Sequence, residues 1–176
     1  MNKIIDIFLL LALLYCAYTD IKTRKIKNYI TFPLMIGGII LNTYLNGIDG
    51  LLFSLKGLIL AFLVSILFSI FKGFGDGDVK LFMGIGAIKG ISFTLDVFVF
   101  SLFISIILSV LISPKRFLNS IKNIYNMTKM AIYQVPYTIT TKNSAMTVAY
   151  ALPILMGFIL TTIFGGDIIW SILFKN

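Results

Sequence analysis

The chain carries the stretch Gly75-Asp76-Gly77-Asp78-Val79-Lys80-Leu81, which places two carboxylates and two glycines at the start of a hydrophobic segment. In a membrane protein, an ionisable side chain near the hydrocarbon must find partners or a wet cavity, so it marks a candidate functional site. The flanking sequence must therefore show whether the chain is a membrane protein and which chemistry these carboxylates serve.

The composition indicates an integral membrane protein. The 176 residues are 59% hydrophobic and only 12% charged, with a mean hydropathy of +0.99, which is too apolar for an ordinary soluble domain. The formal net charge of +8 is compatible with nucleic acid, but the cations lie in short segments between apolar runs. That placement is typical of membrane topology, so we expect contact with an anionic cytoplasmic leaflet and no nucleic-acid partner.

The apolar runs predict an all-α, polytopic fold with about six transmembrane helices in a single domain, residues 1–176. The run from Asn28 to Ile48 is charge-free, and its length suffices to cross a core of about 30 Å. We expect the first run to be a retained helix and not a signal peptide, because Asp6 follows Lys3 and no small-x-small cleavage site comes after it. The six predicted spans are 7–18, 28–48, 51–71, 79–90, 91–112 and 144–164.

Two segments are predicted to lie at the membrane interface. Apolar and basic residues alternate with helical periodicity after Pro114, which predicts an interfacial helix around 115–135 that serves either as a linker or as a substrate-docking lid. The end of the chain, residues 167–176, contains Trp170, a residue typical of headgroup depth.

The distribution of cations predicts the orientation. Eleven of the 15 Lys and Arg residues fall in segments 20–28, 72–80 and 113–144. By the positive-inside rule these three segments are cytoplasmic, which places the N-terminus outside.

The residue inventory excludes several chemistries. The chain has no histidine and only one cysteine, Cys16, so Ser-His-Asp, Cys-His, histidine-zinc and cysteine-zinc sites are excluded, as is a disulfide within the chain. We expect no metal and no cofactor. All seven acidic residues are aspartates, and any carboxylate chemistry must come from Asp6, Asp20, Asp49, Asp76, Asp78, Asp96 and Asp167.

The predicted topology brings Asp20, Asp76 and Asp78 to the same membrane face. Each also has a purely structural interpretation: Asp20 can be solvated among neighbouring cations, and Asp78 can be the N-cap of a helix that begins at Val79. Two carboxylates in a site of low dielectric, however, share a proton and titrate as a unit. Such a pair can activate water and protonate a leaving nitrogen without histidine or metal. Ser–Lys pairs are a further alternative, at Ser54/Lys56 and Ser69/Lys72.

Two motifs carry a resemblance to a known family. Residues Tyr18–Asn28, read together with Gly75–Leu81, resemble the type IV prepilin peptidases, which are membrane aspartyl proteases of the Gly-x-Gly-Asp class. Lys27 departs from the family's usual Ile-Pro-Asn but leaves the aspartate in register. The resemblance implies a short, peptidase-only form that is also similar to archaeal preflagellin peptidases. Because the cysteine tetrad of the long form is missing, we expect no methyl transfer.

The resemblance also implies roles for individual residues. Asp20 and Asp78 would be the catalytic pair, and Gly75, Gly77 and Lys80 would support the motif. Asp76 occupies the variable position between the glycines, where it would at most contact substrate.

We therefore expect an aspartic-type endopeptidase that removes the leader of prepilin-like precursors of the type IV pilus kind, at the cytoplasmic face of the inner membrane. One alternative is a non-enzymatic assembly or transport subunit. Another is an intramembrane protease of the signal-peptide-peptidase group, although that group has Tyr-Asp and Pro-Ala-Leu elements where this chain has Thr19-Asp20 and Ala151-Leu152-Pro153.

Overall fold

The computed structural model describes residues 3–70, 75–112 and 150–166, and all of its regular structure is helical. The helices are α1 (Lys3–Thr23), α2 (Asn28–Ile70), α3 (Asp76–Ile112) and α5 (Ala151–Phe164). Three of the described helices are long and apolar enough to cross a membrane, at Lys3–Thr23, Asn28–Ser69 and Asp76–Ile112, whereas α5 is shorter. The all-α class is confirmed, and the count of six spans stays a prediction.

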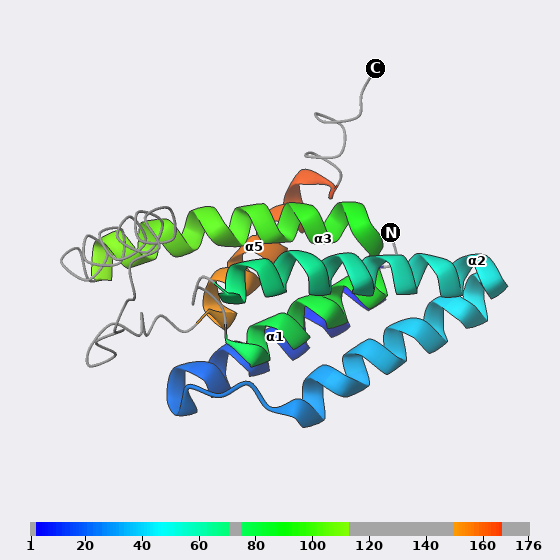
Figure 1. Ribbon diagram of the computed structural model, residues 1–176, viewed down its shortest axis with the longest axis horizontal. Coiled ribbons are helices and arrows are strands. Elements are labelled where there is room, and N and C mark those ends of the chain that lie inside the picture. Colours follow the sequence, from blue (N-terminus) through cyan, green and yellow to red (C-terminus); the bar gives the residue numbers. More distant parts are fainter. Residues whose placement is uncertain (1–2, 71–74, 113–149, 167–176) are drawn as a thin grey trace, which may run out of the picture. The chain divides into compact units, whose positions relative to one another are not determined.

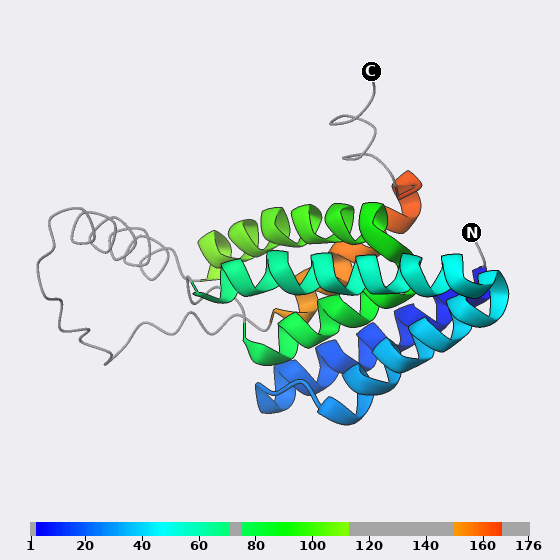
Figure 2. The same cartoon turned by 45° about the vertical axis from the view of Figure 1, so that its right-hand side comes forward.

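Glycines break both long helices. Gly47 in α2 has φ 60° and ψ −135°, and Gly90 in α3 has φ 77° and ψ −169°, conformations that only glycine adopts at low cost. At each glycine the chain turns back on itself, so α2 is a helical hairpin, and so is α3 up to residue 104 (Figures 1 and 2). Residues 3–104 and α5 belong to one compact unit.

Several predicted boundaries need correction. The turn predicted around residues 46–50 is reduced to Gly47, since both arms stay helical up to it. The fourth predicted span starts at Asp76 and not at Val79, because the exposed Gly75 is the residue that precedes the helix. The first span extends to Thr23. Segments 113–149 and 167–176, with the predicted interfacial helix and Trp170, lie outside the described residues.

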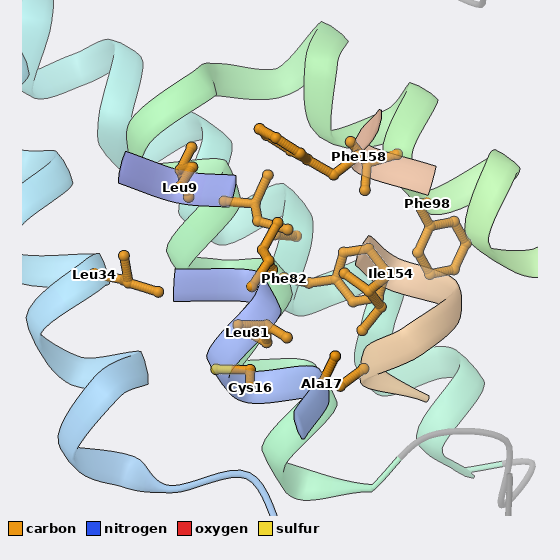
Figure 3. Packing of buried hydrophobic residues seen from close by; sticks show 14 of the residues in the cluster. Leu9, Cys16, Ala17, Leu34, Leu81, Phe82, Phe98, Ile154 and Phe158 are labelled. Atoms are coloured by element: carbon orange, nitrogen blue, oxygen red, sulfur yellow. The ribbon is translucent and has the colours of Figure 1, made fainter. Parts of the chain in front are cut away.

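The interior of this unit is a cluster of aliphatic and aromatic side chains from all four helices. Leu81, Phe82 and Ile154 are fully buried (Figure 3). Phe158 packs edge-on against Phe93, with ring centroids 5.6 Å apart. Outward-facing residues such as Ile4 and Phe8 are instead exposed. Lipid is the medium in which such an apolar exterior is stable.

Small residues let the two hairpins approach closely. A Cβ on Gly57 would lie 2.1 Å from the Gly86 carbonyl oxygen, and one on Gly86 would lie 2.4 Å from the Gly57 carbonyl oxygen. In lipid, burial of apolar surface gives little driving force for helix association. Close van der Waals packing of small residues and interhelical hydrogen bonds stabilise the association instead. Asn42 adds polar contacts by donating to Ser54 Oγ at 2.9 Å and to the Ala87 carbonyl at 3.0 Å.

The two ends of this unit differ chemically. Near the Gly90 turn, Lys89 forms an ion pair with Asp6 of α1, and its ammonium lies 4.9 Å from the centroid of the Phe93 ring. The opposite end, where α1 ends and α2 and α3 begin, carries the residues singled out by the sequence.

Candidate active site

An open cleft of about 280 Å³ lies where α1 ends and where α2 and α3 begin. Both predicted catalytic carboxylates line it, although they are 58 residues apart in the chain. Among the described residues, the lining consists of Asp20, Arg24, Lys25, Ile26, Asn28, Gly75, Asp76, Gly77, Asp78 and Lys80. All the predicted site residues therefore lie around one cleft.

Asp78 belongs to the first turn of α3. Gly75 precedes the helix and Asp76 is its first residue, so Asp78 is at the third helical position. The Oδ2 of Asp78 accepts a hydrogen bond from the Gly75 N–H at 2.9 Å. A side chain that reaches back in this way forms half of a capping box. The N-cap interpretation of Asp78 is therefore wrong, since the residue satisfies the N–H of the position before the helix.

The second oxygen of Asp78 is chemically distinctive. Asp78 is only 7% exposed, and its Oδ1 is buried with no hydrogen-bond partner among the residues that the structure describes. Burying a carboxylate oxygen without a donor is costly. This oxygen is thus available for a proton, a water or a substrate group.

Asp20 lies in the last turn of α1 and is 8% exposed. Its Oδ2 accepts a hydrogen bond from the backbone N–H of Ala151, the first residue of α5, at 3.2 Å. Its carbonyl accepts from the N–H of Arg24 at 2.8 Å, and Arg24 has a left-handed φ of 54°. This conformation is uncommon outside glycine, and it ends α1 just after Asp20, so that the following residues form one wall of the cleft.

The motif residues around Asp78 have separate roles. Gly77 lies against Ile26, because a Cβ on Gly77 would come within 2.8 Å of the Ile26 Cβ. Lys80 donates to Asn28 Oδ1 at 3.1 Å and lies over the Phe32 ring, 5.4 Å from its centroid, so it links the start of α3 to the start of α2. Asp76 is exposed at the rim of the cleft.

The structure also bears on the Ser–Lys alternative. Ser54 Oγ is fully buried, accepts from Asn42 and donates to the Gly38 carbonyl at 3.3 Å. It thus serves as a helix-packing contact far from the cleft lining. Ser69 has a hydrogen-bonding or electrostatic partner, and Lys72 lies outside the described residues.

The predicted site residues did not include the Ala151 N–H or four residues of the cleft lining, Arg24, Lys25, Ile26 and Asn28. The Ala151 N–H has no sequence signal, because every residue except proline offers a backbone donor. Asn28 does have a sequence signal, since it is the last residue of the motif Tyr18–Asn28. For metals, no group of three or more His, Cys, Asp or Glu side chains within 3–70, 75–112 and 150–166 is arranged to hold an ion.

Fold and site together define a helical membrane protein with two buried carboxylates in one cleft. Residues 7–112 match the model of the type IV leader peptidase family. This match covers more than half of the chain, and the chain therefore belongs to that family.

Two curated relatives give the same indication. The chain is 37% identical over 83 residues to a preflagellin peptidase of Methanococcus voltae, an alignment that covers 45% of this chain and 35% of the relative. It is 35% identical over 82 residues to a preflagellin peptidase of Methanocaldococcus jannaschii, covering 44% and 35%. The alignments thus span about a third of the length of each relative. No solved structure matches the chain significantly.

Proposed function

We propose that the protein is a membrane aspartyl endopeptidase that cleaves the leader from prepilin-like or preflagellin-like precursors. The observation that carries this proposal is the location of Asp20 and Asp78, two buried carboxylates from separate family motifs, in the lining of one cleft. Membership of the leader peptidase family and the names of the two relatives support the reaction class.

The reaction is hydrolysis by a carboxylate pair. One carboxylate takes a proton from water as the water oxygen attacks the scissile carbonyl carbon, and the other carboxyl gives its proton to the leaving nitrogen as the C–N bond breaks. The two groups exchange one proton per cycle. An amide bond is thereby hydrolysed with water as the only co-reactant.

The substrate is an extended chain with a basic leader, a glycine and a hydrophobic helix, cut after the glycine. Gly77 leaves room for the substrate backbone to approach, because it adds no side chain to the cleft lining. Asp76 at the rim has the charge to attract basic leader residues. We propose that the cleft faces the cytoplasm from the inner membrane, with the N-terminus outside and no methyl transfer.

The proposal is tested by incubating the purified protein in detergent with such a precursor and mapping the cut by mass spectrometry. Wild-type protein is expected to cut after the glycine, and Asp20→Asn and Asp78→Asn, each present at normal membrane levels, are expected to lose cleavage. Mild effects of both substitutions would instead favour a non-enzymatic assembly or transport subunit.

A further inference from the structure

The first backbone N–H of α5 contacts the carboxylate of Asp20, and this contact gives α5 a place in the reaction. We propose that the N-terminus of α5 is the positioning element that holds Asp20 as the water-activating carboxylate, while Asp78 delivers the proton to the leaving nitrogen. This inference rests on the proposed peptidase function. It concerns a helix outside residues 7–112, the part that the family model matches.

Helix geometry explains why Asp20 is held at this point. The first N–H groups of a helix have no partner within the helix, and together with the helix dipole they favour an anion. The side chain of Tyr150, the N-cap of α5, makes no capping hydrogen bond to the helix. Asp20 takes over this role from α1, with its Oδ2 3.2 Å from the Ala151 nitrogen.

Packing fixes the end of α5 that meets Asp20. Ile154 and Phe158 are 0% and 2% exposed, and both belong to the same buried cluster as Ala17 of α1 (Figure 3). Gly157 presses against α3, because a Cβ there would lie 2.9 Å from the Val97 carbonyl oxygen. The N-terminus of α5 is therefore held by contacts on two helices, and so is the carboxylate that it binds.

The surroundings of the two carboxylates are unequal. Each carboxylate accepts one backbone N–H, Asp20 from Ala151 and Asp78 from Gly75. The difference lies in the second oxygen of Asp78, Oδ1, which is buried with no partner among the described residues. The shared proton is better placed on the carboxyl with the unpartnered oxygen. Asp20 therefore accepts the proton of water, Asp78 protonates the amine product, and the proton on Asp20 then returns to Asp78 to complete the cycle.

Other charged and titratable groups also face this site and contribute to the pH profile of the reaction. Among the described residues they are Cys16, Arg24 and Lys25 from α1 and the segment after it, and Asp76, Asp78 and Lys80 from α3.

The test removes one hydrogen-bond donor and no side chain. Replacing Ala151 by lactic acid through nonsense suppression converts its amide to an ester in the full-length protein, and the lost N–H is one that the helix itself does not use. We expect kcat for precursor cleavage to fall about tenfold, as for loss of a hydrogen bond to a charged group, with KM little changed. The acidic limb of the pH–activity profile should move to higher pH, because the anion has lost a donor.

A matched control lies one turn further along α5. The Ile154 N–H donates to the Tyr150 carbonyl at 3.2 Å, so the ester at position 154 weakens the same helix without touching Asp20. This control should lower the thermal stability and leave the acidic limb in place. Equal pH profiles for the two esters would overturn the proposal, as would full activity of the position-151 ester.

A conventional substitution gives a second readout if the ester proteins do not accumulate. Gly157→Ala should displace α5 and move the acidic limb in the same direction, whereas Met156→Ala, at an exposed position of the same helix, should not. An unmoved limb in Gly157→Ala would contradict the proposal. Failure of the peptidase function is distinguishable, since wild-type protein would then not cleave at all.

Discussion

Gly75 and Gly77 are equivalent in the motif but not in the structure. A Cβ on Gly75 would meet only Asp78 Oδ2, at 3.4 Å, which is an ordinary contact, whereas a Cβ on Gly77 would meet Ile26 at 2.8 Å. Gly77 therefore determines how closely the start of α3 approaches the chain segment that follows Asp20. The distance between the two carboxylates depends on that approach.

The first prediction follows from this difference. Gly77→Ala should lower precursor cleavage by at least about tenfold, because overpacking of about 1–3 kcal/mol separates the two walls of the cleft. Gly75→Ala, the matched control, should retain most of the activity. The check is the initial cleavage rate at equal membrane levels, and a larger loss in Gly75→Ala than in Gly77→Ala would contradict this account of the cleft.

For single residues, the sequence predicts which side chains belong to the site better than it predicts which backbone groups do. Asp20 and Asp78 were identifiable because each lies in a motif, and the structure brings both to one cleft. The N-cap interpretation of Asp78 was wrong because a helix start cannot be located to within two residues from composition alone. The Ala151 donor could not be predicted, since its role depends only on where α5 begins.

At the scale of helices, contact between glycine backbones holds the α2 hairpin against α3. Gly57 and Gly86 approach so closely that neither position has room for a Cβ. Asn42 reinforces the contact by joining both arms of α2 to the carbonyl end of the first arm of α3. These contacts set the position of α3, and therefore that of Asp78.

The second prediction compares two glycines of α2. Gly57→Ala should destabilise the protein by about 1–3 kcal/mol through overpacking. Gly37→Ala, where nothing lies within 4 Å of the added Cβ, should be neutral or stabilising by up to about 1 kcal/mol, because alanine is the better helix former. Apparent Tm in detergent measures both, and an unchanged Tm for Gly57→Ala would contradict the close packing of α2 on α3.

Helix ends were predictable where glycine marks them. Gly47 and Gly90 break α2 and α3 near the predicted span boundaries, and α5 ends at Phe164, directly before a left-handed Gly165. Which helices pack together was not predictable, because in an apolar chain nearly every face can be buried. The contact of α5 with α1 is of that kind.

At the scale of the whole molecule, orientation in the membrane is predicted from the distribution of the cations. The rule counts the Lys and Arg residues in short loops near the ends of spans. Lys89 is one of the four cations that the prediction places on or near the outer side, yet it is partly buried and forms an ion pair with Asp6. The orientation stays a prediction, which labelling can test.

The third prediction tests this orientation by cysteine labelling in a Cys16→Ala background. Lys25→Cys, at the cleft, should react with a membrane-impermeant maleimide only in inside-out vesicles, and Asp49→Cys, next to the Gly47 turn, only in intact cells. Both positions are exposed. The reverse pattern would place the cleft outside and contradict the cytoplasmic site.

The central claim is that Asp20 and Asp78 form the catalytic pair and that Asp76 does not belong to it. Its most direct test is single-turnover cleavage of one precursor by Asp78→Asn and Asp76→Asn at equal membrane levels. The account predicts a loss of at least about a thousandfold for Asp78→Asn, the scale of a lost acid–base catalyst. It predicts a loss of less than about tenfold for Asp76→Asn, the scale of an exposed charge. Comparable rates for the two variants, or a greater loss in Asp76→Asn, would contradict it.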